Sequence, residues 1–260
     1  MIDLKLNEEL RNKYNPDGSA LRSYQMILLG ILKEFDAICK SNNINYWLSS
    51  GTCLGAIRHG GFIPWDDDID VEMLYEDYLK FKSVFKETER LVLQTYDNDL
   101  FYTQPFSKLR LKGINIKEGK RIKHYKYNGP FVDIFCMEYS PYWLAFICHQ
   151  SVGAMRHYSY HIKESGIQLF VFKIWKKLNK YLIRFCRLIS LFRKPHTLRH
   201  SLGVGLEKNI RKDYEIFPLG KAMFEGYSFP VPGDYHHYLE RIFGNYMEIP
   251  PNKHTHSLHI

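Results

Sequence analysis

The sequence predicts an α/β (α+β) fold, in which a small mixed sheet is flanked by helices and followed by a helical C-terminal portion. Three observations support this prediction. Apolar residues recur every three or four positions between residues 19 and 41, which is the spacing of an amphipathic helix. Short apolar runs of strand length occupy residues 46–48 and 131–135. Residues 141–194 return to helical periodicity.

Composition narrows the class of protein. The chain has 260 residues, of which 45% are hydrophobic and 15% aromatic, so it can bury a substantial core and is too apolar to be disordered. We expect a catalytic core over residues 1–140 and a mostly helical portion over residues 141–260 packed on it. The formal charge of +8 favours anionic partners, but it does not choose among nucleotides, phosphorylated glycans, membranes and nucleic acid.

The cysteines and the first residues predict a cytoplasmic protein. The five cysteines are widely spaced and form no Cys-x-x-Cys motif, so neither a disulfide framework nor a zinc site is suggested. The chain begins with a mixed, polar segment that does not look like a signal peptide. It contains no run of about 18 apolar residues, so no transmembrane helix is expected.

The first elements in chain order are a helix and a short strand. The turn signal Asn15-Pro16-Asp17-Gly18 precedes Ser19, which is placed to cap a helix that continues to about Ser41. The aromatic, apolar run at residues 46–48 is typical of a buried strand. We expect the helix to pack in the core.

A turn at Ser50-Gly51-Thr52 opens the next helix, which we expect over residues 53–59 with Ser50 or Thr52 as N-cap. Backbone N–H groups at a helix N-terminus attract anions, and glycine lets a phosphate approach the backbone. Alone, this turn fits an ordinary helix start better than a phosphate site. The acidic residues that follow strengthen the second interpretation.

Four aspartates occur within five positions: Asp66, Asp67, Asp68 and Asp70. Because alternate residues of a strand share a face, a strand here places Asp68 and Asp70 side by side, with Ile69 and Val71 in the core. Paired carboxylates repel each other unless a cation lies between them, and hard oxygen ligands suit Mg²⁺. The pattern therefore predicts a metal site, with a solvated acidic turn as the alternative.

Residues 46–73 resemble the signature of the LicD family, whose nucleotidyltransferase-fold members are related to fukutin and the fukutin-related protein. The stretch from Gly51-Thr52-Cys53-Leu54-Gly55 to Pro64-Trp65-Asp66-Asp67-Asp68-Ile69-Asp70 carries the resemblance. It resumes at residues 131–135 and near the C-terminus. The family transfers phosphocholine or a polyol phosphate from a CDP-activated donor to a glycan. The resemblance implies substrate-binding roles for Ser50, Gly51, Thr52, Arg58, His59, Trp65, Lys108, Glu225 and His256.

The next segments predict a helix over residues 75–87 and strands over residues 91–95 and 103–112. In the second strand, Lys108 and Arg110 alternate with leucines and so share one face. They either reach a donor phosphate or face solvent. The resemblance favours Lys108 for the donor, because the family has a similar Lys-Leu-Arg segment.

Asp133 is a lone carboxylate in the apolar run of residues 131–135. An unpaired buried charge is costly, so this residue needs a partner or a chemical role. The resemblance implies that it joins Asp68 and Asp70 as a third acid. It would serve as a metal ligand, as a general base for the acceptor hydroxyl, or as both. A structural salt bridge is the alternative.

A basic amphipathic helix is expected near residues 167–194. From Ser165 to Leu206 the chain has nine Lys or Arg and no Asp or Glu. One predicted face is apolar: Ile167, Phe170, Ile174, Leu178, Leu182, Phe185, Ile189 and Phe192. The other is largely basic: Lys173, Lys176, Lys177, Lys180, Arg184 and Arg187. The pattern fits a core-packed helix with a solvated basic face and membrane-surface docking equally well.

The last third of the chain predicts a helix over residues 200–213, two extended pieces within residues 223–232, and a closing helix over residues 235–243. The resemblance places basic residues and His near Lys253, His254 and His256. The spacing of the tail histidines matches no standard metal site, so an exposed tail is the favoured interpretation.

Together with these features, the resemblance implies an enzyme that binds a CDP-linked donor with one or two Mg²⁺ ions, with Mn²⁺ as a substitute. A glycan hydroxyl, on a lipid-linked or free acceptor, would attack the distal phosphorus, and CMP would leave. Attack on the nucleotide-side phosphorus is the alternative reaction, and a non-catalytic membrane or glycan-binding protein is the alternative class. Nucleic acid is not expected as a partner, because no reader motif occurs. The expected location is the cytoplasm, including the inner face of the plasma membrane.

Overall fold

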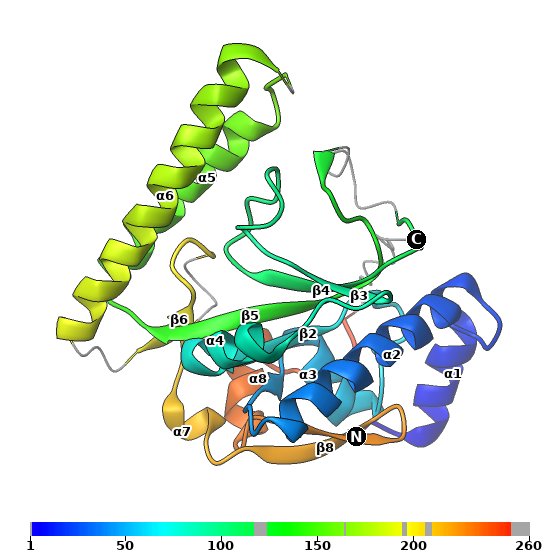
Figure 1. The fold of residues 1–260 in the computed structure, drawn as a ribbon. Helices are drawn as coiled ribbons and strands as arrows, with labels where there is room; N and C mark the ends of the chain where they lie inside the picture. Colours follow the sequence, from blue (N-terminus) through cyan, green and yellow to red (C-terminus); the bar gives the residue numbers. More distant parts are fainter. Residues whose placement is uncertain (1, 117–123, 164, 194–196, 206–209, 251–260) are drawn as a thin grey trace.

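The computed structural model describes residues 2–116, 124–163, 165–193, 197–205 and 210–250. It confirms the α/β fold, with about 48% of the described residues in helices and a mixed, curled sheet covered by helices (Figure 1). The helices are α1 (Leu4–Tyr14), α2 (Ala20–Ser41), α3 (Ser50–His59), α4 (Tyr75–Val84), α5 (Tyr142–Ser159), α6 (Gly166–Arg193), α7 (Asp213–Ile216) and α8 (Tyr235–Phe243). The strands are β1 (Trp47–Leu48), β2 (Asp70–Leu74), β3 (Leu91–Gln94), β4 (Ser107–Leu111), β5 (Phe131–Tyr139), β6 (Leu198–His200), β7 (Ile210–Arg211), β8 (Gly220–Phe224) and β9 (Tyr227–Val231).

Strand β5 lies at the centre of the main sheet. Parallel β2 pairs with one of its edges, while antiparallel β4 and then β6 pair with the other. Strand β1 extends the sheet beyond β2, β3 extends it beyond β4, and β7 extends it beyond β6. Because β5 is nine residues long, it joins the early strands to those of the C-terminal half.

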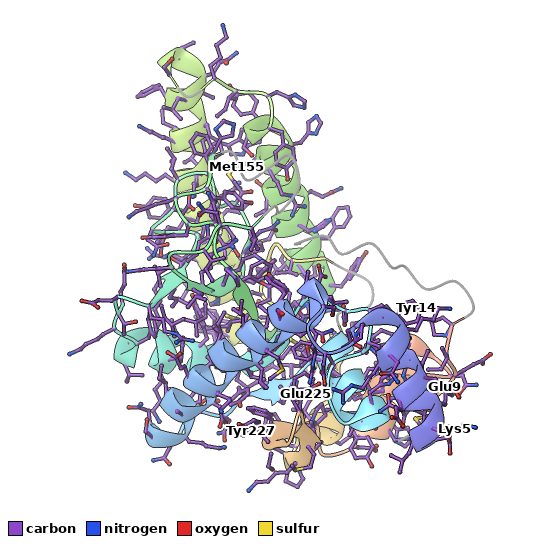
Figure 2. The ribbon with its side chains drawn as sticks, turned by 90° about the vertical axis from the view of Figure 1, so that its right-hand side faces the viewer. Lys5, Glu9, Tyr14, Met155, Glu225 and Tyr227 are labelled. Atoms are coloured by element: carbon purple, nitrogen blue, oxygen red, sulfur yellow. The ribbon has the colours of Figure 1, made fainter. Side chains whose placement is uncertain are left out.

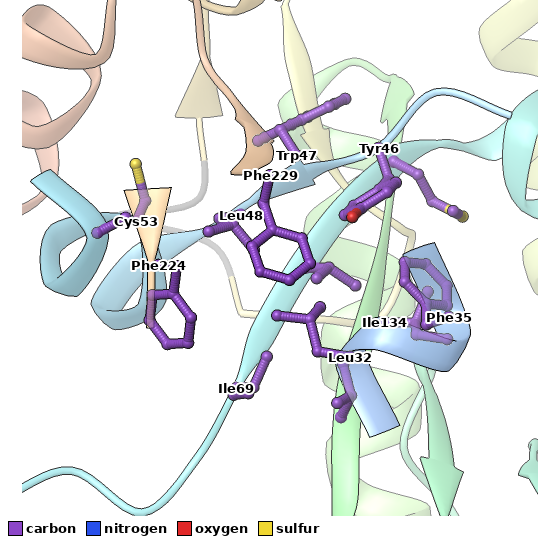
Figure 3. Close-up of a cluster of buried hydrophobic side chains, with 14 of the residues drawn as sticks. Leu32, Phe35, Tyr46, Trp47, Leu48, Cys53, Ile69, Ile134, Phe224 and Phe229 are labelled. Atoms are coloured by element: carbon purple, nitrogen blue, oxygen red, sulfur yellow. The ribbon is translucent and has the colours of Figure 1, made fainter. Parts of the chain in front are cut away.

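Helix α2 packs against the core, as the sequence predicts. Ser19 caps it, since its Oγ accepts a hydrogen bond from the Arg22 N–H at 3.1 Å. Leu32 and Phe35 are fully buried, and Figure 3 shows them beside Ile134 of β5. The Phe35 ring also meets Tyr46 edge-on, with 4.8 Å between the ring centroids. Burial of such side chains is the main source of stability here.

The C-terminal residues build the same core rather than a separate one. Phe224 and Phe229 of the β8–β9 hairpin and Tyr238 of α8 are buried in the cluster that also contains Leu32 and Ile134. The hairpin and α8 are confirmed predictions.

The predicted helix over residues 200–213 is wrong. Residues 198–200 form β6, which pairs with β5, and residues 210–211 form β7, which pairs with β6. Pairing at the free edge of β5 decides the conformation here, because tertiary context overrides weak local propensity.

Helices α5 and α6 form an antiparallel hairpin that projects from the sheet (Figure 1). A small separate core, with Leu144, Cys148 and Cys186, joins the two helices. Met155 lies buried in this hairpin, where Figure 2 shows it well away from Glu225. In the part of the chain that the structure describes, no helix combines the length and apolar character needed to span a bilayer.

Candidate active site

Three charged side chains stand in register on neighbouring strands of the sheet. Asp70 of β2 is opposite Asp133 of β5, and Asp133 is opposite Lys108 of β4. The Lys108 Nζ lies 2.7 Å from Asp133 Oδ1, and both residues are buried. The structure therefore brings Asp70 and Asp133 together, as predicted, and adds a lysine ammonium to them. Lys108 does not face solvent, so that alternative is wrong.

Asp68 lies just before β2, not on it, because the strand begins at Asp70. The expected placement of Asp68 and Asp70 on one strand face is therefore wrong in detail. The two carboxyl groups still interact. Burial raises the pKa of Asp70 well above its usual range, and the charges of Asp68, Asp133 and Asp66 raise it further, while Lys108 opposes them.

Asp66 belongs to the same acidic cluster, although sequence analysis gave site roles only to Asp68, Asp70 and Asp133. Burial raises the pKa of Asp66 well above its usual range, and the charge of Asp68 and a hydrogen bond with it add to this effect. The Asp66 carboxylate also lies against Gly51, where a Cβ would come within 3.0 Å of Oδ2. The spacing of Gly51 and Asp66 in the sequence gives no signal of this approach.

The acidic cluster (Asp66, Asp68, Asp70 and Asp133) carries more negative charge than Lys108 balances. Carboxylate oxygens are suitable Mg²⁺ ligands, and a divalent cation would relieve the repulsion that raises the pKa of Asp70. Within the described ranges, no three His, Cys, Asp or Glu side chains form a group that could hold a metal ion. One or two carboxylates with substrate phosphates suffice for Mg²⁺, so a pair such as Asp68 and Asp70 fits the ion.

The turn before α3 is fixed by α8. Helix α3 begins at Ser50 rather than near residue 53, and neither Ser50 nor Thr52 is its cap, because Ser49 takes that position. Ser50 has a φ of 46°, a left-handed conformation that is uncommon for a non-glycine residue. Its N–H donates to the Tyr238 hydroxyl at 3.1 Å. Gly51 follows at the helix start, as expected.

Thr52 connects this helix to the acidic cluster. Its side chain is buried, and Oγ1 accepts a hydrogen bond from the Asp70 N–H at 2.8 Å. Thr52 therefore fixes the start of β2. This hydrogen bond gives the buried Thr52 hydroxyl a structural role rather than a substrate-binding one.

Arg58 and His59, both predicted to bind substrate, are buried in contacts within the protein. Arg58 donates to the Tyr246 carbonyl at 2.7 Å, and its Nε donates to His59 Nε2 at 3.0 Å. The His59 Nδ1 lies 2.7 Å from Asn7 Oδ1. Burial and the charge of Arg58 lower the pKa of His59 to about 3, so its ring is neutral. These residues join α3 to α1 and to the C-terminal segment.

The remaining predicted substrate residues contact other parts of the protein or lie outside the described chain. Trp65 packs on the core and meets Tyr14 edge-on at 5.4 Å between centroids. The Glu225 carboxylate accepts hydrogen bonds from Arg22 at 2.6 Å and from the Phe62 N–H at 3.1 Å. His256 lies outside the described residues.

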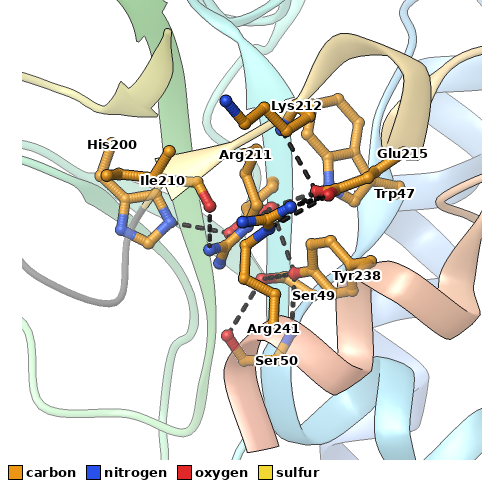
Figure 4. A network of polar contacts seen from close by, with 11 residues as sticks. Trp47, Ser49, Ser50, His200, Ile210, Arg211, Lys212, Glu215, Tyr238 and Arg241 are labelled. Carbon is orange, nitrogen blue, oxygen red and sulfur yellow. Dashed lines mark hydrogen bonds and ion pairs between the residues drawn. The ribbon is translucent and has the colours of Figure 1, made fainter. Parts of the chain in front are cut away.

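A second buried charge network is centred on Glu72, two residues after Asp70 on β2 and so on the same face of that strand. Figure 4 shows residues of this network, among them Trp47, Arg211 and Tyr238. The Glu72 carboxylate is fully buried and lies 2.7 Å from both Arg211 and His200. Trp47 Nε1 donates to it at 2.8 Å, and the Tyr238 hydroxyl lies at 3.3 Å. Burial alone would raise the pKa of Glu72, but Arg211 and His200 hold it below its usual range.

Sequence analysis assigned no role to Glu72. Its alternation with Asp70 along β2 is the one signal that could have identified it, since a buried carboxylate requires a partner. Tyr238 contacts both Glu72 and Ser50, so this network also holds the turn that precedes α3.

Comparison with known proteins assigns the family. Residues 43–165 match the family model described as LicD/FKTN/FKRP, nucleotidyltransferase domain. The chain is 32% identical over 262 residues to the lipopolysaccharide cholinephosphotransferase LicD of Haemophilus influenzae, covering 92% of this chain and 96% of that protein. It is also 40% identical over 58 residues to the human ribitol 5-phosphate transferase FKRP, covering 22% of this chain and 10% of that protein. These matches show that the chain belongs to the LicD family.

Proposed function

We propose that this protein transfers a phospho-substituent, phosphocholine or a polyol phosphate, from a CDP-linked donor to a hydroxyl of a cell-surface glycan. Suitable acceptors are glycans of the lipopolysaccharide, capsule or teichoic-acid type. The observation that carries the proposal is the register of Asp70, Asp133 and Lys108 on three adjacent strands. The similarity to a lipopolysaccharide cholinephosphotransferase over nearly the whole chain supports the reaction class.

Each residue of the site would have a defined role. Asp68 and Asp70 would hold Mg²⁺, which when bound supplies the positive charge that polarises the donor pyrophosphate. The N-terminus of α3 at Gly51 would bind a phosphate through backbone N–H groups. Lys108 would contact the donor phosphate with its ammonium, as a compact cation suits a phosphate oxygen. Asp133 would accept the proton of the attacking glycan hydroxyl.

The proposed reaction forms one bond to phosphorus, breaks another and moves one proton. The acceptor oxygen forms a bond to the distal phosphorus, the bond from that phosphorus to the bridging oxygen breaks, and CMP leaves. The acceptor proton passes to Asp133 and then to solvent. Attack on the other phosphorus would instead leave the nucleotide on the acceptor, so the products separate the two reactions.

The decisive experiment incubates the protein with CDP-choline, CDP-ribitol and CDP-glycerol in the presence of Mg²⁺, with and without glycan from the source cells. Release of CMP that requires one donor and is stimulated by the glycan supports the proposal. A nucleotide-labelled glycan would show nucleotidyl transfer instead. Absence of any glycan-dependent product with every donor would contradict the proposal.

A further inference from the structure

Helix α6 presents an apolar stripe to solvent. We define this apolar stripe as Ile167, Phe170, Ile174, Leu178, Phe185 and Phe192. Their exposed fractions range from 44% for Ile174 to 86% for Phe192. Their spacings of three, four and seven residues place them along one side of the helix. Among described residues, this is a long, continuous apolar surface rather than the scattered exposure that is ordinary on proteins.

The opposite side of α6 binds the protein through polar groups. Lys176 is buried, and its Nζ donates to three backbone carbonyls within residues 99–102, at 2.6, 2.7 and 3.0 Å. Arg187 forms a bidentate pair with Glu138, at 2.6 and 3.1 Å. The expected core-packed helix with a solvated basic face is therefore wrong, because several cations face inward and most of the predicted apolar face is exposed.

Three cations flank the apolar stripe. Lys173, Lys177 and Arg184 are exposed, and each directly precedes a residue of the stripe. They therefore all lie on the same flank of the helix. Neither α5 nor α6 contains an acidic residue. The exposed surface thus combines apolar side chains with positive charge that no acid of these helices neutralises.

We propose that the apolar stripe docks α6 in the interfacial layer of a membrane that contains anionic lipid. The large side chains would lie among acyl chains, and the flanking cations would contact lipid phosphates. A second copy of this surface fits less well, because it would bring further cations and no acids against the flank. The inward contacts of α6 would hold the rest of the protein at the membrane. This inference does not depend on which group the enzyme transfers.

Vesicle flotation tests the apolar contact. Wild-type protein should float with vesicles of phosphatidylethanolamine and phosphatidylglycerol, and much less with vesicles of phosphatidylcholine. Phe170→Ser, Leu178→Ser and Phe185→Ser should each weaken binding about tenfold, since each removes a large apolar side chain from the acyl layer. The control is Leu79→Ser on α4, which removes an exposed leucine elsewhere and should bind normally. Binding that is absent in the wild type, or equal in all four variants, overturns the proposal.

The flank is tested with two triple variants of equal charge loss. The flank variant should bind anionic vesicles about fivefold more weakly for each cation removed, and it should show a smaller salt dependence. It combines Lys173→Gln, Lys177→Gln and Arg184→Gln. The control variant removes exposed lysines on other elements and should bind nearly as wild type. It combines Lys5→Gln, Lys86→Gln and Lys221→Gln. Equal loss in both variants would mean that net charge alone drives binding, which contradicts the assigned surface.

A fluorescent probe reports insertion directly. All five native cysteines are buried, so Leu178→Cys offers an accessible thiol for an environment-sensitive fluorophore. Its emission should shift to the blue with anionic vesicles, whereas the same label on Leu79→Cys should not respond. Sedimentation velocity distinguishes self-association. A wild-type dimer that Leu178→Ser makes monomeric, without vesicle binding, would assign the stripe to a second copy and refute the membrane proposal.

Discussion

The Lys108 ammonium lies 2.7 Å from an oxygen of Asp133 on the adjacent strand, in the same register row as Asp70. This pair supplies the partner that a buried carboxylate in an apolar strand requires. It also places a cation where donor phosphate and acceptor hydroxyl would meet in the proposed reaction. The salt bridge and the proposed catalytic role of Asp133 are therefore compatible, and kinetics can separate them.

The first prediction concerns Asp133. If Asp133 is the general base, Asp133→Asn should reduce transfer about a hundredfold or more, and the loss should persist at saturating Mg²⁺. If it is only a metal ligand, excess Mg²⁺ should restore much of the rate. The measurement is CMP release at increasing Mg²⁺, with thermal unfolding recorded alongside. A folded variant with full activity at ordinary Mg²⁺ would leave only the structural ion pair with Lys108.

The second prediction concerns the metal pair. Asp68→Asn and Asp70→Asn should each abolish CMP release, because a neutral amide binds Mg²⁺ far more weakly than a carboxylate does. Asp70→Asn should also preserve or increase stability without metal, since the pKa of Asp70 is raised by burial and by like charges.

Stabilisation by added Mg²⁺ provides a readout besides activity. The wild type should melt at higher temperature with Mg²⁺, and both variants should lose that increase. Asp17→Asn, which changes a highly exposed acid, is the matched control and should respond as wild type does. Normal turnover in either site variant would remove that residue from the metal role.

The third prediction is an acid-induced loss of stability through His59. The pKa of His59 is lowered from 6.5 to about 3 in the folded protein. Below pH 6.5 the unfolded chain therefore binds a proton at this residue that the folded protein does not bind. Stability should therefore fall between pH 6.5 and about 3, by an amount on the order of a few kcal/mol, since one pKa unit corresponds to about 1.4 kcal/mol.

Urea unfolding across this pH range measures the effect. His59→Gln should flatten the acid limb of the curve relative to its own value at neutral pH. His161→Gln, at an exposed site, should leave the limb unchanged. An acid limb that is identical in the wild type and His59→Gln would refute this assignment.

The fourth prediction concerns the buried charge network around Glu72. Glu72→Gln or Arg211→Met should each destabilise the protein by about 3–5 kcal/mol, because each leaves an uncompensated buried charge. The double variant should recover part of that loss, since both charges are then absent. The free energy of unfolding of all four proteins gives the coupling energy.

A surface pair provides the control for this network. Glu34→Gln breaks an ion pair with Arg90 in which both side chains are substantially exposed, so it should cost less than about 1 kcal/mol. Additive losses in the Glu72 and Arg211 double variant would show that the pair does not act as a unit.

The sequence by itself determined the elements whose signal is local. The apolar spacing from residue 19 to residue 41 and the Ser19 cap predicted α2 nearly to its ends, because helix periodicity and capping depend on neighbouring residues. The aspartate cluster and the family resemblance likewise pointed to Asp68, Asp70 and Asp133 as one site. Alternation and motif spacing are properties of a short segment, so they can be read from it.

Only the tertiary structure decided which groups meet across the chain. Glu72 contacts Arg211 and His200, and Ser50 contacts Tyr238, although these residues lie far apart in the sequence. The amphipathic pattern of α6 predicted a helix but not which face would be buried. Lys176 donates hydrogen bonds to backbone carbonyls, and Arg187 pairs with the Glu138 carboxylate. Because these cations bind the protein, the apolar stripe on the opposite side of α6 faces solvent. The physical reason is that a helix pattern defines two faces, whereas the packing partner selects one of them.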